Sequence, residues 1–452
     1  MNKNSIAIVS FIAILLASCS KNDDVYNPPV QDPEVAIVNL SSGTEIAQED
    51  TVYFKAKVSE GSTLAWSVDG KSANVTDSVF KFVSEALGSH TISLTASNQD
   101  KQAAAQVDVT VYGKYKYGTF ILNEGNMTNE TGTIVFISPK GKVMDSAYYR
   151  ANGTFLGNVA QDLFINNGKL YVISQNGKTN AVGNSFENDG LLVVANAETL
   201  KKEAAYNSEL SVLSWPTHVA VLNEQNVFLR DNSGIYRFNT TTKALTFVQG
   251  SAAAAKLTMA VSNNKVFAAA GTKVYVIEAD KDAISYAINM NAPVSGVVKA
   301  DDGNIWVSTT GSPNKISKIN FRDYSVIKVN EISNGGLSAG WGATPGITAK
   351  GDTLYFSNAG TKIYRHIFSS NATEFMADAQ TMVENANIVY NNIAVHPITG
   401  EVYLNTIKGY ADYKTSNRIS VFNFSGTSPE LSANYANYTR FPAGIFFTYN
   451  FK

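Results

Sequence analysis

The sequence has little cysteine, histidine and charge, and each shortage excludes a class of protein. A single cysteine, Cys19, rules out an intramolecular disulfide, and four scattered histidines give no cluster with the spacing of metal ligands. Charged residues make up only 16% of the chain, and a formal net charge of −2 offers no basic surface to nucleic acid. Beyond the N-terminal leader no apolar run is long enough to cross a bilayer.

Motifs of enzymes are missing as well. The chain has no G-x-S-x-G nucleophile elbow, no phosphate-binding loop and no cysteine nucleophile after Cys19. Asp301-Asp302-Gly303 and His396-Pro397 fall in expected turns, where turn chemistry explains them. We therefore expect a protein that is not an enzyme, with no cofactor, no metal site and no nucleic-acid partner.

The single cysteine follows a short leader sequence. Lys3 supplies a positive charge, residues 6–16 are apolar, and Leu16-Ala17-Ser18-Cys19 has the small residues of a lipobox. We predict a lipoprotein signal peptide over residues 1–18, with Cys19 as the lipidated N-terminus of the mature protein. Residues 19–33 are polar and rich in proline, which predicts a flexible tether.

Residues 34–113 carry short runs in which polar and apolar residues alternate. This spacing is typical of a β-sandwich, with Trp66 as the core aromatic and Asp69-Gly70 as a hairpin turn. The predicted strands begin near Val35, Thr51, Leu64, Val79, Thr91 and Ala105.

The remainder, residues 114–452, repeats one unit: an inner strand, a turn rich in Asn, Asp and Gly, a strand with an aromatic residue, and a third strand. Copies anchored at residues 170, 227, 266, 305, 354 and 402 are 57, 39, 39, 49 and 48 residues apart. The shortest spacing corresponds to one four-stranded propeller blade, and the longer ones to a blade with an inserted loop. Inner strands are predicted to begin near Val159, Thr217, Leu257, Val294, Gly346, Ile388 and Phe441.

The last inner strand, from Phe441, has no partner strands after it. Residues 118–149 contain three strands, 118–123, 132–138 and 142–149, that lack an inner strand. An open array would instead need polar caps at both ends. The sequence therefore predicts an all-β protein: an N-terminal Ig-like β-sandwich followed by a seven-bladed β-propeller that the C-terminal strand closes.

Several motifs carry family resemblances. Trp66-Ser67-Val68-Asp69-Gly70, followed by residues 87–92, resembles PKD and related Ig-like modules. The propeller resembles a Bacteroidota family of surface lipoproteins with a YVTN-like seven-bladed propeller. That resemblance rests on Gly118-Thr119-Phe120-Ile121-Leu122-Asn123-Glu124-Gly125-Asn126, Leu156-Gly157-Asn158-Val159-Ala160-Gln161-Asp162, Gly168-Lys169-Leu170-Tyr171-Val172 and Phe441-Pro442-Ala443-Gly444.

The resemblance implies a function and a location. The family includes outer-membrane proteins that capture cobalamin and pass it to a TonB-dependent transporter. Ser20-Lys21-Asn22-Asp23-Asp24 resembles the lipoprotein export signal of Bacteroidota, which implies the outer face of the outer membrane. The protein would then contact the membrane through its lipid anchor only.

Propeller geometry places the ligand site at one end of the ring. Loops between second and third strands emerge on one face, and three are long and polar, 123–132, 174–190 and 405–417. A Gly-rich insertion at 333–342 opens on the same face, and the residues just before each inner strand should line the rim. The candidate ligand-binding residues are Asn123, Glu124, Asn126, Gln161, Asp162, Trp215, His218, Trp341, Tyr390, Asn391, Tyr410 and Phe441.

Five of these candidates also have a structural explanation. Trp215 and Trp341 could pack between blades, Asn123 and Glu124 could form hydrogen bonds in the closure, and His218 alone is typical of a structural histidine. We expect a surface lipoprotein that captures a nutrient, with cobalamin as the best single ligand. The alternative is a glycan- or protein-binding adhesin or assembly subunit. A propeller lyase or hydrolase is disfavoured because the chain displays no grouping of His, Tyr and acid.

Overall fold

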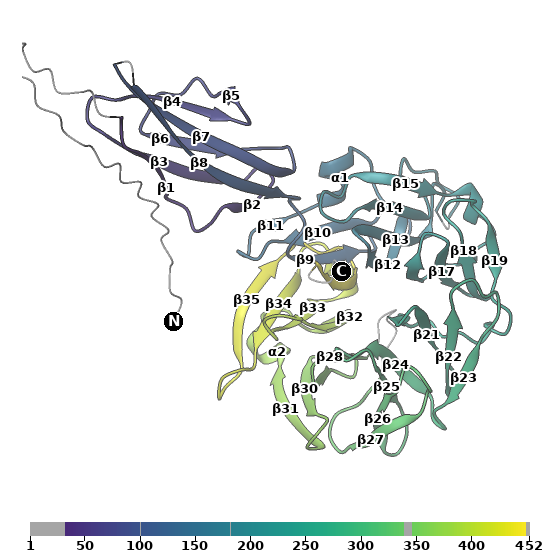
Figure 1. Cartoon of the computed structure of the whole chain (residues 1–452). Coiled ribbons are helices and arrows are strands. Elements are labelled where there is room, and N and C mark those ends of the chain that lie inside the picture. Colours follow the sequence, from purple (N-terminus) through teal and green to yellow (C-terminus); the bar gives the residue numbers. More distant parts are fainter. Residues whose placement is uncertain (1–31, 100, 181, 339–345, 449–452) are drawn as a thin grey trace, which may run out of the picture. The chain divides into compact units, whose positions relative to one another are not determined.

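The computed structural model describes residues 32–99, 101–180, 182–338 and 346–448 (Figure 1). Contacts divide the chain into two compact units, of which the first consists of residues up to 46, 51–83 and 88–110. The predictions for the signal peptide, Cys19, most of the tether and Trp341 concern residues outside the described ranges. No helix in the described ranges is long and apolar enough to cross a membrane.

The N-terminal unit is a sandwich of two antiparallel sheets. One has the order β1 (Val35–Asn39), β3 (Thr51–Val58), β6 (Val79–Val83), and the other β2 (Glu45–Ala47), β8 (Lys101–Tyr112), β7 (Gly88–Asn98), β4 (Thr63–Val68), β5 (Lys71–Ser72). Trp66 of one sheet stacks on Phe80 of the other with ring centroids 5.1 Å apart, so the two sheets share one core.

The predicted hairpin turn of this unit is confirmed. Asp69 and Gly70 both have positive φ, 51° and 76°, as a two-residue type I′ turn between β4 and β5 requires. Asp69 Oδ2 lies 2.8 Å from Nδ1 of His90, which accounts for His90 as a structural residue.

The second unit contains seven four-stranded antiparallel sheets arranged as a ring of blades (Figure 1). From the inner strand outward, the first three blades along the chain are β12 (Asn158–Asn166), β13 (Lys169–Asn176), β14 (Leu192–Asn196), β15 (Lys202–Tyr206); β16 (His218–Asn223), β17 (Asn226–Asp231), β18 (Gly234–Phe238), β19 (Leu245–Phe247); and β20 (Ala260–Ser262), β21 (Lys265–Ala270), β22 (Lys273–Glu278), β23 (Tyr286–Asn289). The next three blades are β24 (Val294–Lys299), β25 (Ile305–Thr309), β26 (Asn314–Ile319), β27 (Val326–Ile332); β28 (Ile347–Lys350), β29 (Thr353–Phe356), β30 (Lys362–Ile367), β31 (Ala372–Asp378); and β32 (Ile388–Val395), β33 (Val402–Ile407), β34 (Asn417–Asn423), β35 (Glu430–Ala436). The seventh blade combines the last strand of the chain with three early ones: β36 (Pro442–Phe447), β9 (Thr119–Asn123), β10 (Thr133–Ile137), β11 (Val143–Met144).

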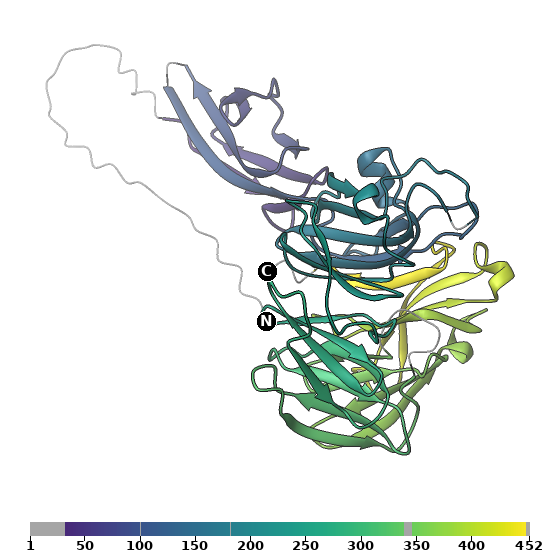
Figure 2. The ribbon, with the colours of Figure 1, turned by 90° about the vertical axis from the view of Figure 1, so that its right-hand side faces the viewer.

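The last of these sheets, the closing blade, joins the two ends of the propeller. β36 pairs antiparallel with β9, from Pro442 opposite Asn123 to Phe447 opposite Thr119. In both views the yellow end of the ribbon lies beside the blue strands (Figures 1 and 2). The seven-bladed propeller closed by its C-terminal strand is therefore confirmed.

Blade strands are apolar at consecutive positions because both faces of each sheet are buried. Leu170 and Val172 of β13 pack towards the closing blade, whereas Tyr171 and Ile173 pack towards the blade of β16. Successive side chains of a strand point to opposite faces, so one strand contributes to two cores. This explains why the repeats lack the alternation seen in the sandwich.

One predicted strand is wrong in its extent. The run 142–149 was expected as a strand, but β11 covers only Val143–Met144, and α1 (Ala147–Asn152) follows. Ser146 adopts a left-handed conformation that ends the extended run, and Gly153 caps the helix at φ 70°. The helix buries Ala147 and Tyr148 in the core beside the closing blade, a packing gain that an extended chain would lack.

The remaining helices are single turns in loops. They are η1 (Ser208–Leu210), α2 (Ala379–Met382) and η2 (Tyr410–Asp412).

Candidate functional site

The three long loops that were predicted on one face do meet. They join β9 to β10, β13 to β14 and β33 to β34, in three neighbouring blades. Asn180 of the second loop donates to the Thr128 carbonyl of the first at 2.8 Å. Tyr413 of the third accepts from Asn126 of the first at 3.2 Å, and Lys414 forms an ion pair with Glu130. These contacts make one continuous wall beside the closure.

β-bulges redirect side chains next to this wall. The pairing of β12 with β13 shifts between Ala160 and Asp162, so Gln161 lies in a bulge. The pairing of β32 with β33 shifts between Val389 and Ile393, which places Tyr390 in a second bulge. Bulges break the strict alternation of a strand and frequently orient side chains at functional sites.

The inner strands β12, β16 and β32 begin within one residue of their predicted starts near Val159, Thr217 and Ile388. Gln161, Asp162, Tyr390 and Asn391 were expected just before the inner strands, but they lie within β12 and β32. His218 is likewise the first residue of β16 rather than part of the preceding loop.

Glu124 lies at the centre of the site. Its N–H donates to the Phe441 carbonyl at 2.8 Å, and the Gly125 N–H donates to the Arg440 carbonyl at 3.0 Å, which ties the loop to the closing strand. The Glu124 carboxylate accepts from the Tyr390 hydroxyl at 3.1 Å and from the side chain of Gln161. Both bulged residues therefore converge on this one carboxyl group.

The surroundings of Glu124 change its protonation. Burial raises the pKa of Glu124 to about 7, although the bonds from Tyr390 and Gln161 and the charge of Lys256 act in the opposite direction. Burial and the neighbouring carboxylate raise the pKa of the Tyr390 phenol, which stays a hydrogen-bond donor. At neutral pH Glu124 is consequently present in both the protonated and the ionised form.

Asp162 and His218 form a buried pair between two blades. His218 Nδ1 lies 3.1 Å from Asp162 Oδ2, which also accepts from the Val219 N–H at 3.2 Å. Burial lowers the pKa of His218 against the opposing effect of Asp162, so the imidazole is neutral. His218 has no exposed surface, and its Nε2 has no hydrogen-bond partner among the described residues. In this structure the contact between His218 and Asp162 joins β16 to β12.

Two separate polar pairs lie here, Glu124 with Tyr390 and Asp162 with His218. Their members come from the closing blade, β12, β16 and β32.

Four aromatic rings form a cluster beside Glu124. Tyr390 lies 5.1 Å from Phe441 and 6.4 Å from Tyr410, measured between ring centroids. Tyr413 stacks on Phe441 at 3.9 Å with an interplanar angle of 12°. Tyr410 is 62% exposed on η2, so the cluster presents an aromatic surface to solvent.

The other candidates differ in how exposed they are and in what they contact. Asn123 is fully buried, accepts from the Arg440 N–H at 3.1 Å and donates to Thr133, so it serves the closure as its structural alternative predicted. Asn126 donates a hydrogen bond to the Tyr413 hydroxyl and so joins two loops of the wall. Trp215 is 45% exposed before β16, which speaks against packing between blades. Asn391 is placed in β32 by its backbone, and Trp341 lies outside the described residues.

Two residues at the site were missed by sequence reasoning. Tyr413 lies in one of the long loops, and its aromatic character could have identified it. Lys256 precedes β20 on the far side of the ring, and its charge acts on Glu124 and, in the opposite sense, on the pKa of His218. Burial lowers the pKa of Lys256, and Glu124 counteracts this effect. Nothing in the sequence around Lys256 signals this role.

The channel inside the ring is lined mainly by apolar side chains, together with Asp162, Thr258 and Thr348. A cavity of about 260 Å³ touches the inner strands β12, β16, β24, β28, β32 and β36, with Leu163, Met259 and Ile393 in its wall. A cavity of about 730 Å³ lies towards the first-to-second turns, at Asn166 and Asp301. The polar site around Glu124 thus lies at the opposite end from the larger cavity.

Comparisons with known proteins agree with this architecture. A family model described as "Domain of unknown function (DUF5074)" matches residues 117–448, and the PKD domain model matches residues 36–111. The chain belongs to the DUF5074 family. No curated protein gives a significant match to the sequence.

Solved structures include one that shows the same fold. A Bacteroides thetaiotaomicron protein described as quinonprotein alcohol dehydrogenase-like is 19% identical, with a TM-score of 0.54 over 93% of this chain and 100% of that chain. Dihydro-heme d1 dehydrogenase is 12% identical (TM-score 0.41, 74% of this chain and 76% of that one). Kuenenia stuttgartiensis hydrazine synthase is 13% identical (TM-score 0.35, 51% and 67%). At these identities the first likeness concerns the fold alone.

Proposed function

We propose that this DUF5074 protein is a lipid-anchored surface protein that captures a nutrient for a TonB-dependent transporter, with cobalamin or a related corrinoid as the ligand. The observation that supports this most is the aromatic cluster beside a set of amide and carboxyl groups. Tyr390, Tyr410 and Tyr413 each lie within ring-contact distance of Phe441, and the Glu124 carboxyl group contacts Tyr390 and Gln161. A corrinoid has a flat face for stacking and amide edges for hydrogen bonds.

The loop wall supports the same proposal. Three loops from neighbouring blades hold one another through Asn180, Asn126 and Tyr413, so the binding surface is preorganised. A preorganised surface loses little conformational entropy on binding, which favours affinity. The bonds from Glu124 and Gly125 to the closing strand anchor this wall to the rest of the propeller.

Calorimetric titration of cyanocobalamin into the chain from residue 20 onward tests the corrinoid version. We expect binding in the micromolar range or tighter, and no binding at micromolar ligand would overturn it. Tyr410→Ala should weaken binding about fivefold, because one stacking contact contributes about 1 kcal/mol. Tyr286→Ala is the matched control, since Tyr286 is 51% exposed on β23.

A glycan-binding adhesin is the second candidate. The exposed rings of Tyr410 and Trp215, which are 62% and 45% exposed, also suit the apolar faces of sugars. This candidate would be favoured if the protein bound oligosaccharides on a glycan array, if Trp215→Ala abolished that binding, and if no corrinoid bound.

The anchor has its own test. Metabolic labelling with a radioactive or alkyne-tagged fatty acid should label the wild-type protein and leave Cys19→Ala unlabelled. External protease should digest the protein on intact cells if it faces outward. Labelling of Cys19→Ala, or full protection from protease, would contradict the proposed anchor or its orientation.

A further inference from the structure

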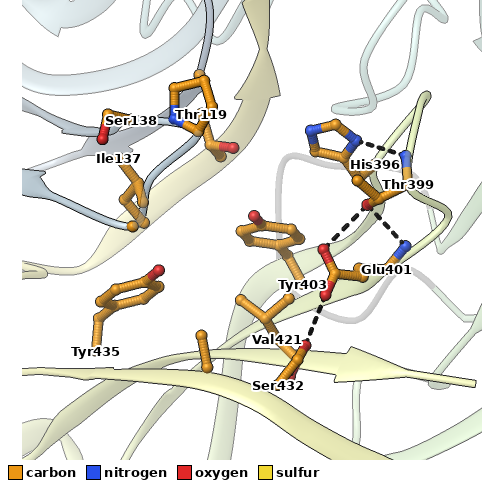
Figure 3. A pocket seen from close by; sticks show the side chains of 14 residues that line it. Thr119, Ile137, Ser138, His396, Thr399, Glu401, Tyr403, Val421, Ser432 and Tyr435 are labelled. Carbon is orange, nitrogen blue, oxygen red and sulfur yellow. Dashed lines mark hydrogen bonds between the residues drawn. The ribbon is translucent and has the colours of Figure 1, made fainter. Parts of the chain in front are cut away.

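A cavity of about 350 Å³ lies between the closing blade and the blade of β32–β35 (Figure 3). Its wall includes the turn from β32 to β33 and the turn from β10 to β11, which emerge on the face opposite the Glu124 loop. The volume is at the lower end of the range of about 300–1,000 Å³ that is typical of small-molecule sites. The cavity is separate from the site of the proposed function, and the inference does not depend on that proposal.

A hydrogen-bonded chain fixes one carboxylate in this cavity. His396 Nδ1 accepts from the Thr399 N–H at 3.0 Å, which orders the turn. The Thr399 hydroxyl donates to Glu401 Oε2 at 3.0 Å, and the Ser432 hydroxyl donates to Glu401 Oε1 at 2.7 Å (Figure 3). Each carboxylate oxygen has two lone-pair directions, so Glu401 is oriented and can still accept further hydrogen bonds.

Glu401 is the carboxylate in the lining of the cavity, while Lys140 and Lys142 flank the lining residue Gly141 as exposed residues. None of the residues that line the cavity is lysine or arginine, and Glu401 forms no ion pair among the described residues. Lys350 lies outside the lining, and its ammonium group donates to the Ile398 carbonyl at 3.0 Å. A partly buried carboxylate with only uncharged donors creates a negative potential in the cavity.

Two tyrosines, Tyr403 and Tyr435, line the same cavity as Glu401. The hydroxyls of Tyr403 and Tyr435 point into the same space (Figure 3). Burial, with a further contribution from Glu401, raises the pKa of Tyr435, so its phenol stays neutral. Phe447 of the closing strand packs against both Tyr403 and His396, at 5.3 and 4.9 Å, which fixes this side of the cavity. Neutral electron-rich rings beside a carboxylate are the groups that bind ammonium ions.

We propose that this cavity binds a small organic cation that carries an ammonium group, with Glu401 as the counter-charge and Tyr403 and Tyr435 as the aromatic wall. An anion would be repelled by Glu401. A neutral polyol would form hydrogen bonds with the hydroxyls but would leave the negative charge uncompensated.

Choline and its neutral isostere 3,3-dimethylbutan-1-ol test the role of charge. Titrated calorimetrically at low salt into the chain from residue 20 onward, choline should bind at least about tenfold more tightly than the isostere. Equal affinities would overturn the proposal, as would the absence of choline binding at millimolar concentration. Binding of glucose without binding of choline would also overturn it and would identify a sugar site instead.

Substitutions locate the site. Glu401→Gln should weaken choline binding about tenfold or more, whereas Tyr435→Phe, which keeps the ring, should change it by only a few-fold. Glu430→Gln is the matched control, because Glu430 is exposed on β35 and does not line the cavity. Melting temperatures establish that each variant is folded. Unchanged affinity in folded Glu401→Gln would refute the assignment.

Discussion

Replacing Glu124 with glutamine should make the propeller more stable at alkaline pH and change its stability little at acidic pH. The carboxyl group titrates near 4.5 in the unfolded chain, whereas burial raises its pKa to about 7 in the folded protein. Between these two values the folded state binds a proton that the unfolded state has lost. The stability of the wild-type protein therefore falls as pH rises from about 4.5 to about 7, and this loss persists at higher pH.

The magnitude follows from the two pKa values. A pKa difference between about 7 and 4.5 corresponds to roughly 3 kcal/mol, since one pH unit is worth about 1.4 kcal/mol. Glu124 retains partial access to water, which screens the charge, so we expect about 2 kcal/mol. For a propeller of this size, that free energy shifts the melting temperature by about 3 °C.

Melting curves at pH 5 and pH 8 provide the assay. The melting temperature of Glu124→Gln minus that of the wild type should be about 2 °C more positive at pH 8 than at pH 5, because part of the effect is already present at pH 5. Glu187→Gln is the control, because Glu187 is exposed in the loop between β13 and β14. If the difference for Glu124→Gln is the same at both pH values, the assigned environment of this carboxyl group is wrong.

Three further predictions concern the closure and the site. Deleting the chain from Phe441 onward removes β36 and exposes the edge of β9, so the melting temperature should fall by at least about 5 °C; an unchanged value would refute the closure. Lys256→Met removes a charge that favours ionised Glu124, so the pKa of Glu124 should rise, and the pH at which wild-type stability falls because of Glu124 should move upward. A downward shift would contradict this electrostatic coupling. Asn123→Ala leaves the partly buried Arg440 N–H without its acceptor, and urea denaturation should show a loss of about 1–3 kcal/mol. A loss below about 0.5 kcal/mol would argue against a role in closure.

Sequence reasoning succeeded where a feature depends on local pattern and strand count. The closing strand could be predicted because the first three strands lacked an inner strand and the last strand lacked partners. The long loops could be located because turn residues mark the ends of each strand. The run 142–149 was mistaken for a strand because Tyr148 and Tyr149 favour strands locally, whereas the helix forms to bury Tyr148.

The site was predictable only in part. Glu124, Gln161, Tyr390 and Phe441 were identified as candidates and do meet, but the bulges that turn two of them towards Glu124 could not be read from the chain. Bulges arise from the pairing of two strands, and no single strand specifies them.

The sequence by itself determined the number of blades, their order and the closure of the ring, because these follow from periodicity and from which strands lack partners. Tertiary structure alone decided the chemistry. The protonation of Glu124 depends on its burial and on Tyr390, Gln161 and Lys256, which three different blades or loops contribute. The charge state of a carboxyl group depends on the distances to such neighbours and on its access to water, and only the assembled ring sets both.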